Sequence, residues 1–218
     1  MTQLMTFSTK LRPALLAKIA ISLVYGVGII GLLWEESRGL FQQMTPFHLL
    51  LNAIILLYFH QDWDWRFVFF AVFAFVVGMI SEIIGVKTGL IFGDYSYGPV
   101  LGWKIMGVPI IIGVNWLLLA YMWGKLAATK KWHPLVSAIL AALGMVMMDF
   151  LIEPVAISLD FWSWSQEDIP LSNYVGWLAI AFLIQLFFQF LNFRKKNTIS
   201  DYLLLNMCIF FAILKVLL

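Results

Sequence analysis

The sequence predicts an all-α membrane protein, a bundle of about seven transmembrane helices that forms a single membrane domain over residues 1–218. Hydrophobic residues make up 62% of the chain and charged residues 12%, and the mean hydropathy is +0.92. Soluble domains carry about 25% charged residues, so this chain is too apolar to be wetted on all sides. Seven apolar segments approach the roughly 20 residues that span a bilayer. Because lipid offers no partner to unpaired backbone groups, each span is predicted to be helical.

Of the seven predicted spans, the second and seventh have the weakest pattern. The second is short and amphiphilic. No small-residue cleavage site follows the first segment, so we expect a retained span there rather than a removed signal peptide. The predicted ranges are 14–34, 46–60, 66–85, 105–124, 134–156, 174–193 and 200–217.

Basic residues gather in three places that lie on one side of the membrane if the chain has seven spans. They are Lys10, Arg12 and Lys18; Lys125, Lys130 and Lys131; and Arg194, Lys195 and Lys196. The segment 157–173 has no lysine or arginine but contains Asp160, Glu167 and Asp168. Since basic loops favour the cytoplasm, we expect a cytoplasmic N-terminus in a bacterial or archaeal cytoplasmic membrane, with segments 86–104 and 157–173 facing outward.

Several function classes are disfavoured by composition. A net charge of +2 gives no case for nucleic-acid binding. One cysteine and three histidines without metal-ligand spacing give no metal site. The G-x-G-x-x-G run at 26–31 lies inside a predicted span, so it indicates a helix-packing face rather than a dinucleotide site. We therefore expect neither a metal nor a cofactor.

Carboxyl groups inside the predicted spans are the main functional signal, because ionising them away from water is costly. Asp149 and Glu153 lie four residues apart and so share one helix face. Glu82 and Asp149 each lie about 22 Å along spans that run in the same direction. We expect both at similar depth in the outer half of the bilayer, with Glu153 one turn further out.

Other polar groups are expected near these acids. Asn115 lies about 15 Å below the outer surface in the next span, and Asp94 lies in the adjoining outward segment. Pro154 leaves the carbonyl of Phe150 without its helical donor, which predicts a kink and a small wet pocket beside Glu153.

Each of these residues also has a structural interpretation. Glu153 alternatively marks the end of a span, Glu82 pairs with Lys87, and Asn115 forms a helix–helix hydrogen bond. Trp162 and Trp164 alternatively serve as interfacial anchors.

Three motifs together resemble the integral-membrane carotenoid biosynthesis family, which includes γ-carotene 1′-hydratases and bisanhydrobacterioruberin hydratases. The similarity covers roughly residues 65–195. The motifs are Gly93-Asp94-Tyr95-Ser96-Tyr97-Gly98, Met148-Asp149-Phe150-Leu151-Ile152-Glu153-Pro154, and the run from Trp162-Ser163-Trp164 through Ile169-Pro170-Leu171-Ser172-Asn173-Tyr174-Val175-Gly176-Trp177.

The resemblance implies that water is added across the terminal C-1′,2′ double bond of a linear carotenoid, such as lycopene or γ-carotene, drawn from the bilayer. This chemistry needs a proton donor, a stabilised tertiary cation and a placed water. We assign proton donation to Asp149 and water activation to Glu153 or Glu82, while Asp94 stabilises the cation or completes the acid network. Aromatic faces stabilise cations, and the candidates are Tyr95, Tyr97, Trp103 and Trp116, with Asn115 as a further substrate-binding residue.

Two other functions use the same features. A carotenoid end-group cyclase would protonate a similar alkene but quench the cation internally. A proton-coupled transporter or lipid-binding membrane protein would use the acids as a relay, although no internal repeat of the kind common in transporters is evident.

Overall fold

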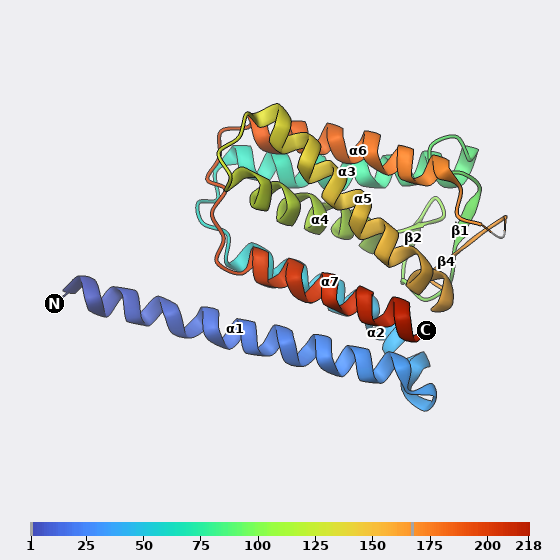
Figure 1. Cartoon of the computed structure of the whole chain (residues 1–218), viewed down its shortest axis with the longest axis horizontal. Helices are drawn as coiled ribbons and strands as arrows, with labels where there is room; N and C mark the ends of the chain where they lie inside the picture. Colours follow the sequence, from blue (N-terminus) through green and yellow to red (C-terminus); the bar gives the residue numbers. More distant parts are fainter. Residues whose placement is uncertain (1, 167) are drawn as a thin grey trace.

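The computed structural model describes the backbone of residues 2–166 and 168–218, with side chains described from Pro13 onward within those ranges. Glu167 lies outside the described residues, as do the side chains of Lys10 and Arg12. The described chain forms seven long helices, each with a stretch long and apolar enough to cross a membrane (Figure 1). They are α1 (Thr2–Leu33), α2 (Glu35–Tyr58), α3 (Trp65–Thr88), α4 (Ile110–Ala128), α5 (Pro134–Ser158), α6 (Leu171–Phe190) and α7 (Ser200–Leu217). The predicted fold class is confirmed, whereas the inside–outside orientation stays a prediction.

Local sequence signals explain where the helix α3 begins and ends. The side chain of Asp64 accepts a hydrogen bond from the backbone N–H of Phe67 at 2.8 Å, which caps the first turn. At the other end, Gly89 adopts the left-handed conformation with φ of 67° that commonly terminates a helix. These caps hold α3 over its full length and set the position of Glu82 within it.

Several helices begin or end at other residues than predicted, and the starts of α1, α2 and α4 differ most. The first span was expected from residue 14, but α1 begins at Thr2. The second was expected over 46–60, but α2 begins at Glu35 and only Trp34 separates it from α1. Glu35 and Glu36 in the first turn favour this early start, because acidic side chains complement the helix dipole. The fourth was expected from residue 105, but residues 104–109 form a hairpin before α4.

The hairpin consists of β2 (Lys104–Ile105) and β3 (Val108–Pro109), which pair antiparallel. Its central residues, Met106 and Gly107, both have positive φ, at 51° and 94°. That backbone geometry is typical of a tight two-residue hairpin turn. The hairpin reverses the chain direction directly before α4 begins at Ile110.

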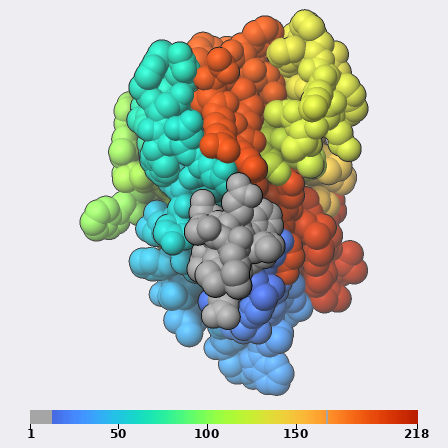
Figure 2. Space-filling model, turned by 90° about the vertical axis from the view of Figure 1, so that its left-hand side faces the viewer, coloured from blue at the N-terminus to red at the C-terminus, as the bar shows by residue number. Residues whose placement is uncertain are grey.

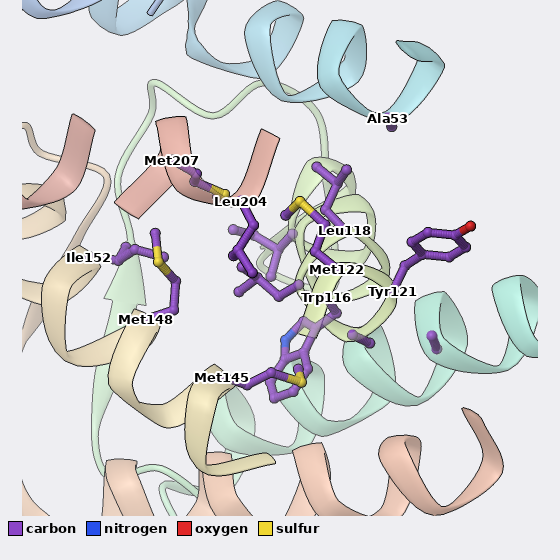
Figure 3. Close-up of a cluster of buried hydrophobic side chains, with 14 of the residues drawn as sticks. Ala53, Trp116, Leu118, Tyr121, Met122, Met145, Met148, Ile152, Leu204 and Met207 are labelled. Carbon is purple, nitrogen blue, oxygen red and sulfur yellow. The ribbon is translucent and has the colours of Figure 1, made fainter. Parts of the chain in front are cut away.

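The helix α4 lies at the centre of the bundle and packs against α2, α3, α5, α6 and α7. In the close-up of the core, Met148 and Ile152 of α5 point toward Leu204 and Met207 of α7, and Trp116 lies on α4 (Figure 3). Figure 2 looks at the end that carries the connections 59–64, 129–133 and 191–199, where α3 and α6 lie side by side above α1 and α2. The core therefore surrounds α4.

A second pair of strands covers the opposite end of the bundle (Figure 1). The strand β1 (Tyr95–Tyr97) pairs antiparallel with β4 (Trp162–Trp164), with Tyr95 opposite Trp164 and Tyr97 opposite Trp162. A side chain at Gly98 would overlap the backbone oxygen of Asp160, so this close approach of the two loops needs glycine. The ribbon joins the two segments that were predicted to face outward.

Candidate active site beneath the aromatic ribbon

Three carboxyl groups, which we call the acid cluster, meet beneath the β1–β4 ribbon. Glu82 comes from α3, and Asp149 and Glu153 come from α5; their exposed fractions are 3%, 1% and 2%. All three line a small cavity of about 20 Å³, the acid cavity. A cavity of this size holds about one water molecule.

Glu82 accepts hydrogen bonds from three aromatic side chains. The hydroxyl groups of Tyr95 and Tyr97 donate to its Oε2 at 2.5 and 2.8 Å, and the indole Nε1 of Trp116 donates to its Oε1 at 2.9 Å. Trp116 is itself held by Trp177, whose ring stacks on it with centroids 4.0 Å apart. Three donors stabilise an ionised carboxylate at this position.

The two carboxyl groups on α5 share one amide. Nδ2 of Asn173 donates to Oδ2 of Asp149 at 2.8 Å and to Oε1 of Glu153 at 3.2 Å. Glu153 also accepts from the indole nitrogens of Trp162 and Trp164, each at 3.0 Å on Oε2. Within the described part of the chain, Oδ1 of Asp149 receives no hydrogen bond, so Asp149 has the fewest donors of the three acids.

The tyrosines of β1 remain hydrogen-bond donors over a wide pH range. Burial and the neighbouring Glu82 raise the pKa of both Tyr95 and Tyr97 above the ordinary value of a phenol. Since a raised pKa keeps the hydroxyl protonated as the solution becomes more alkaline, both side chains can continue to donate to Glu82.

The structure brings most of the predicted site residues together and leaves two apart. Tyr95, Tyr97 and Asn115 line the acid cavity with the acids, and Trp116 contacts it through Glu82. Asp94 is exposed, and its backbone oxygen accepts a hydrogen bond from the N–H of Ser165 at 2.9 Å. Trp103 is 89% exposed beside the β2–β3 hairpin. Neither Asp94 nor Trp103 lines the acid cavity. Asp94 directly precedes β1 and is exposed, and Trp103 directly precedes β2, away from the ribbon.

The structural interpretations of Glu82 and Glu153, and the pocket predicted from Pro154, can each be compared with the observed contacts. Lys87 is exposed, while Glu82 is bound by the three aromatic donors. Glu153 is buried, and α5 continues beyond it to Ser158. The carbonyl of Phe150, which Pro154 frees, accepts from Nζ of Lys215 at 3.1 Å. A side chain of α7 therefore binds the freed carbonyl oxygen. The acid cavity is lined by the acids and the ribbon rather than by this carbonyl group.

Sequence reasoning missed the amide that connects the two acids. Asn173 is 2% exposed and lies one helical turn before Trp177, on the same face of α6. The sequence signal that could have identified Asn173 is its four-residue spacing from Trp177 within the motif 162–177. The indole groups of Trp162 and Trp164 were weighed as interface anchors, and their contacts with Glu153 depend on the β1–β4 pairing.

A larger cavity of about 570 Å³, the apolar cavity, adjoins the acid cavity. Its walls come from α1, α2, α4, α5 and α7 with the loops around Leu101 and Phe161, and nearly all are hydrophobic. Ile112, Asn115 and Trp162 line both cavities. Leu23, Val27 and Phe47 line the apolar cavity and are also exposed, which places it beside the lipid-facing surface.

A sequence model of the protein family described as "Carotenoid biosynthesis protein" matches residues 44–218. The chain belongs to this family. The match begins within α2, continues to the end of the chain and contains the complete acid cluster. The predicted resemblance is confirmed, and it extends beyond the expected range of 65–195.

A curated relative of this carotenoid biosynthesis protein is the bisanhydrobacterioruberin hydratase of the haloarchaeon Haloarcula japonica. The two are 28% identical over 123 residues, which cover 50% of this chain and 40% of the relative. No solved structure matches this chain. The family and the seven apolar helices identify an integral membrane protein, and the family and the relative support a role in carotenoid modification.

Proposed function

We propose that this protein is a carotenoid 1,2-hydratase, which adds water across the terminal C-1′,2′ double bond of a linear carotenoid end by carboxyl-based acid catalysis. The observation that carries the proposal is the contact between two cavities of opposite character. The apolar cavity suits a hydrocarbon chain, and the acid cavity suits one water beside three carboxyl groups. Ile112, Asn115 and Trp162 form their common boundary, where alkene and water would meet.

Asp149 is our candidate for the proton donor. It accepts from Asn173 alone, whereas Glu82 and Glu153 each accept from three donors. Hydrogen-bond donors favour the ionised carboxylate, and two nearby carboxyl groups resist being ionised together. The proton of the α5 pair is therefore best placed on Asp149, which transfers it to C-2′ of the alkene.

The remaining steps use the water and the other two acids. Proton transfer to C-2′ leaves a tertiary cation at C-1′, and the oxygen of the water bonds to this carbon. Glu153 takes the proton that the water loses, and return of a proton to Asp149 restores the starting state. The net reaction consumes one alkene and one water and forms one tertiary alcohol.

The cation would be stabilised by the charge and the rings around the cavity. An ionised Glu82, held by its three donors, supplies preorganised negative charge close to the developing positive charge. The ring of Trp162 lies at the boundary of the two cavities, and the rings of Tyr97 and Trp164 line the acid cavity. Aromatic faces contribute about 0.5–2 kcal/mol each to a nearby cation.

The substrate would enter from the bilayer. Leu23, Val27 and Phe47 line the apolar cavity and are exposed on the apolar perimeter, so a linear carotenoid of the lycopene or γ-carotene type can reach the cavity sideways between helices. No cofactor takes part in the proposed steps. A water-sized polar cavity favours hydration over internal cyclisation, which needs no water.

The test is expression of the chain in cells that accumulate lycopene or γ-carotene, followed by mass analysis of the pigments. Hydration predicts a product heavier by one water, and cyclisation predicts a product of unchanged mass. The Asp149→Asn variant, produced at the same level, is the matched control. An unchanged pigment profile with both substrates would contradict the proposal.

A further inference from the structure

One wall of the apolar cavity carries a polar cluster that the proposed reaction does not use. It consists of Tyr25 on α1 and His48 and Asn52 on α2, which we call the α1–α2 polar cluster. Nδ2 of Asn52 donates to the hydroxyl oxygen of Tyr25 at 2.9 Å, and the rings of Tyr25 and His48 meet edge to face with centroids 4.6 Å apart. Tyr25 and Asn52 are only 4% and 3% exposed.

The α1–α2 polar cluster has unused hydrogen-bonding capacity. Nε2 of His48 is buried and has no partner among the described residues. The hydroxyl of Tyr25 accepts from Asn52, and its own proton has no acceptor in the described part of the chain. If the amide of Asn52 is reversed, the phenol donates to it and an amide N–H is left instead. Either arrangement leaves a donor free, and unpaired buried polar groups are costly.

The rest of the apolar cavity has few other polar side chains that could bind a polar group of a ligand. Thr45 uses its hydroxyl on the backbone oxygen of Phe41 at 3.1 Å, and Asn115 lies at the boundary with the acid cavity. None of Tyr25, His48 and Asn52 lines the acid cavity. The cluster is thus a separate polar position within a hydrocarbon-lined space, suited to recognition rather than to the chemical step.

We propose that the α1–α2 polar cluster binds a hydroxyl group on the polyene that occupies the apolar cavity. A hydroxyl both accepts and donates hydrogen bonds. It therefore accepts from the free donor of the Tyr25–Asn52 pair and pairs with Nε2 of His48 in either tautomer. This inference rests on the proposed function for the polyene nature of the ligand. It makes Tyr25, His48 and Asn52 specificity-determining residues: the apolar walls bind hydrocarbons such as lycopene, and the polar cluster adds affinity for a polyene that carries a hydroxyl group.

The test is a binding comparison that requires no turnover. The purified full chain in detergent is titrated with retinol and with the hydrocarbon that has a methyl group in place of its CH₂OH, and tryptophan quenching reports binding. We expect wild type to prefer retinol by about threefold to tenfold, as one or two net hydrogen bonds would supply. Tyr25→Phe and His48→Phe should each reduce this preference while leaving the affinity for the hydrocarbon unchanged.

Controls separate this inference from the proposed reaction. Tyr58→Phe, at a 75% exposed position outside the cavity lining, should keep the preference. Asp149→Asn should also keep it, even where hydration is lost. Equal affinity of wild type for the two ligands, or an unchanged preference in both Tyr25→Phe and His48→Phe, would overturn the inference. A preference without hydration of any carotenoid would contradict only the proposed function. If Tyr25→Phe does not fold, His48→Phe decides the outcome.

Discussion

Buried polar clusters lie at both ends of the helix bundle, and the acid cluster at one end lines a cavity. The connection cluster, formed by His60, Tyr121 and Asn197, ties the connections 59–64 and 191–199 to α4. Nδ1 of His60 and the hydroxyl of Tyr121 are 2.6 Å apart, and Asn197 donates to the backbone oxygen of Leu56 at 2.8 Å. The side-chain oxygen of Asn197 also accepts from the N–H groups of Ile199 and Ser200 at the start of α7. This cluster fixes chain connections.

The difference between the clusters is one of charge and space. Burial lowers the pKa of His60 below its ordinary value, so its ring is neutral at pH 7, and the ring stacks on Phe67 with centroids 3.6 Å apart. The acid cluster instead places three ionisable groups around a water-sized cavity. Polar burial alone therefore does not identify a site in this protein. We propose the acid cluster as the site because several acids there compete for protons beside a cavity.

Removal of the proposed proton donor should have the largest effect. In Asp149→Asn the amide keeps the shape of the carboxyl group but cannot protonate an alkene, so hydration should fall by at least about 100-fold. Pigment mass analysis measures this, and membrane yield and thermal unfolding in detergent check folding. Normal turnover in this variant would show that another acid gives the proton.

Loss of one donor to Glu153 should have an intermediate effect. Trp164→Phe removes an indole N–H at 3.0 Å from Oε2 of Glu153 but retains an aromatic ring against Tyr95. A hydrogen bond to a charged group contributes about 1.5–3 kcal/mol, so we expect roughly a tenfold slower reaction or more. Initial rates in membranes would measure it, and an unchanged rate would mean that Glu153 acts without this contact.

The connection cluster should respond in stability rather than in activity. Tyr121→Phe removes the hydroxyl that contacts His60, which should lower the free energy of unfolding by about 1 kcal/mol. Hydration per folded molecule should stay unchanged. Unfolding in detergent measures the stability, and hydration rates normalised to folded protein measure the activity. A lower rate with unchanged stability would contradict the purely structural role of the connection cluster.

The smallest effect is expected from substitution of Asp94 and Trp103, the two predicted site residues that do not line the acid cavity. Asp94→Asn and Trp103→Phe change exposed side chains that do not line the acid cavity, so hydration rates should stay within about twofold of wild type. The same rate assay applies. A large loss in Asp94→Asn would indicate that the ribbon moves and brings this carboxyl group to the acids during the reaction.

Much of the fold followed from the chain alone, because a helix in lipid depends on its own length and apolarity. The fifth and seventh spans begin at the predicted residues, Pro134 and Ser200. The matching height of Glu82 and Asp149 along their helices was also predictable, since the rise per residue is constant, and the two line one cavity. Their depth in the bilayer stays a prediction. The early start of α2 and the β2–β3 hairpin were missed because their signals are local: two acids in a first helical turn and a two-residue hairpin turn, rather than an apolar run.

The sequence by itself determined the number of spans, the presence of acids within them and the family to which their motifs belong. Only the tertiary structure decided which side chains surround those acids. The β1–β4 pairing turns Tyr95, Tyr97, Trp162 and Trp164 inward and Asp94 outward, and the packing of α5 on α6 delivers Asn173 to both α5 acids. The physical reason is that a strand alternates its faces, so a side chain's direction depends on the register with a partner distant in sequence.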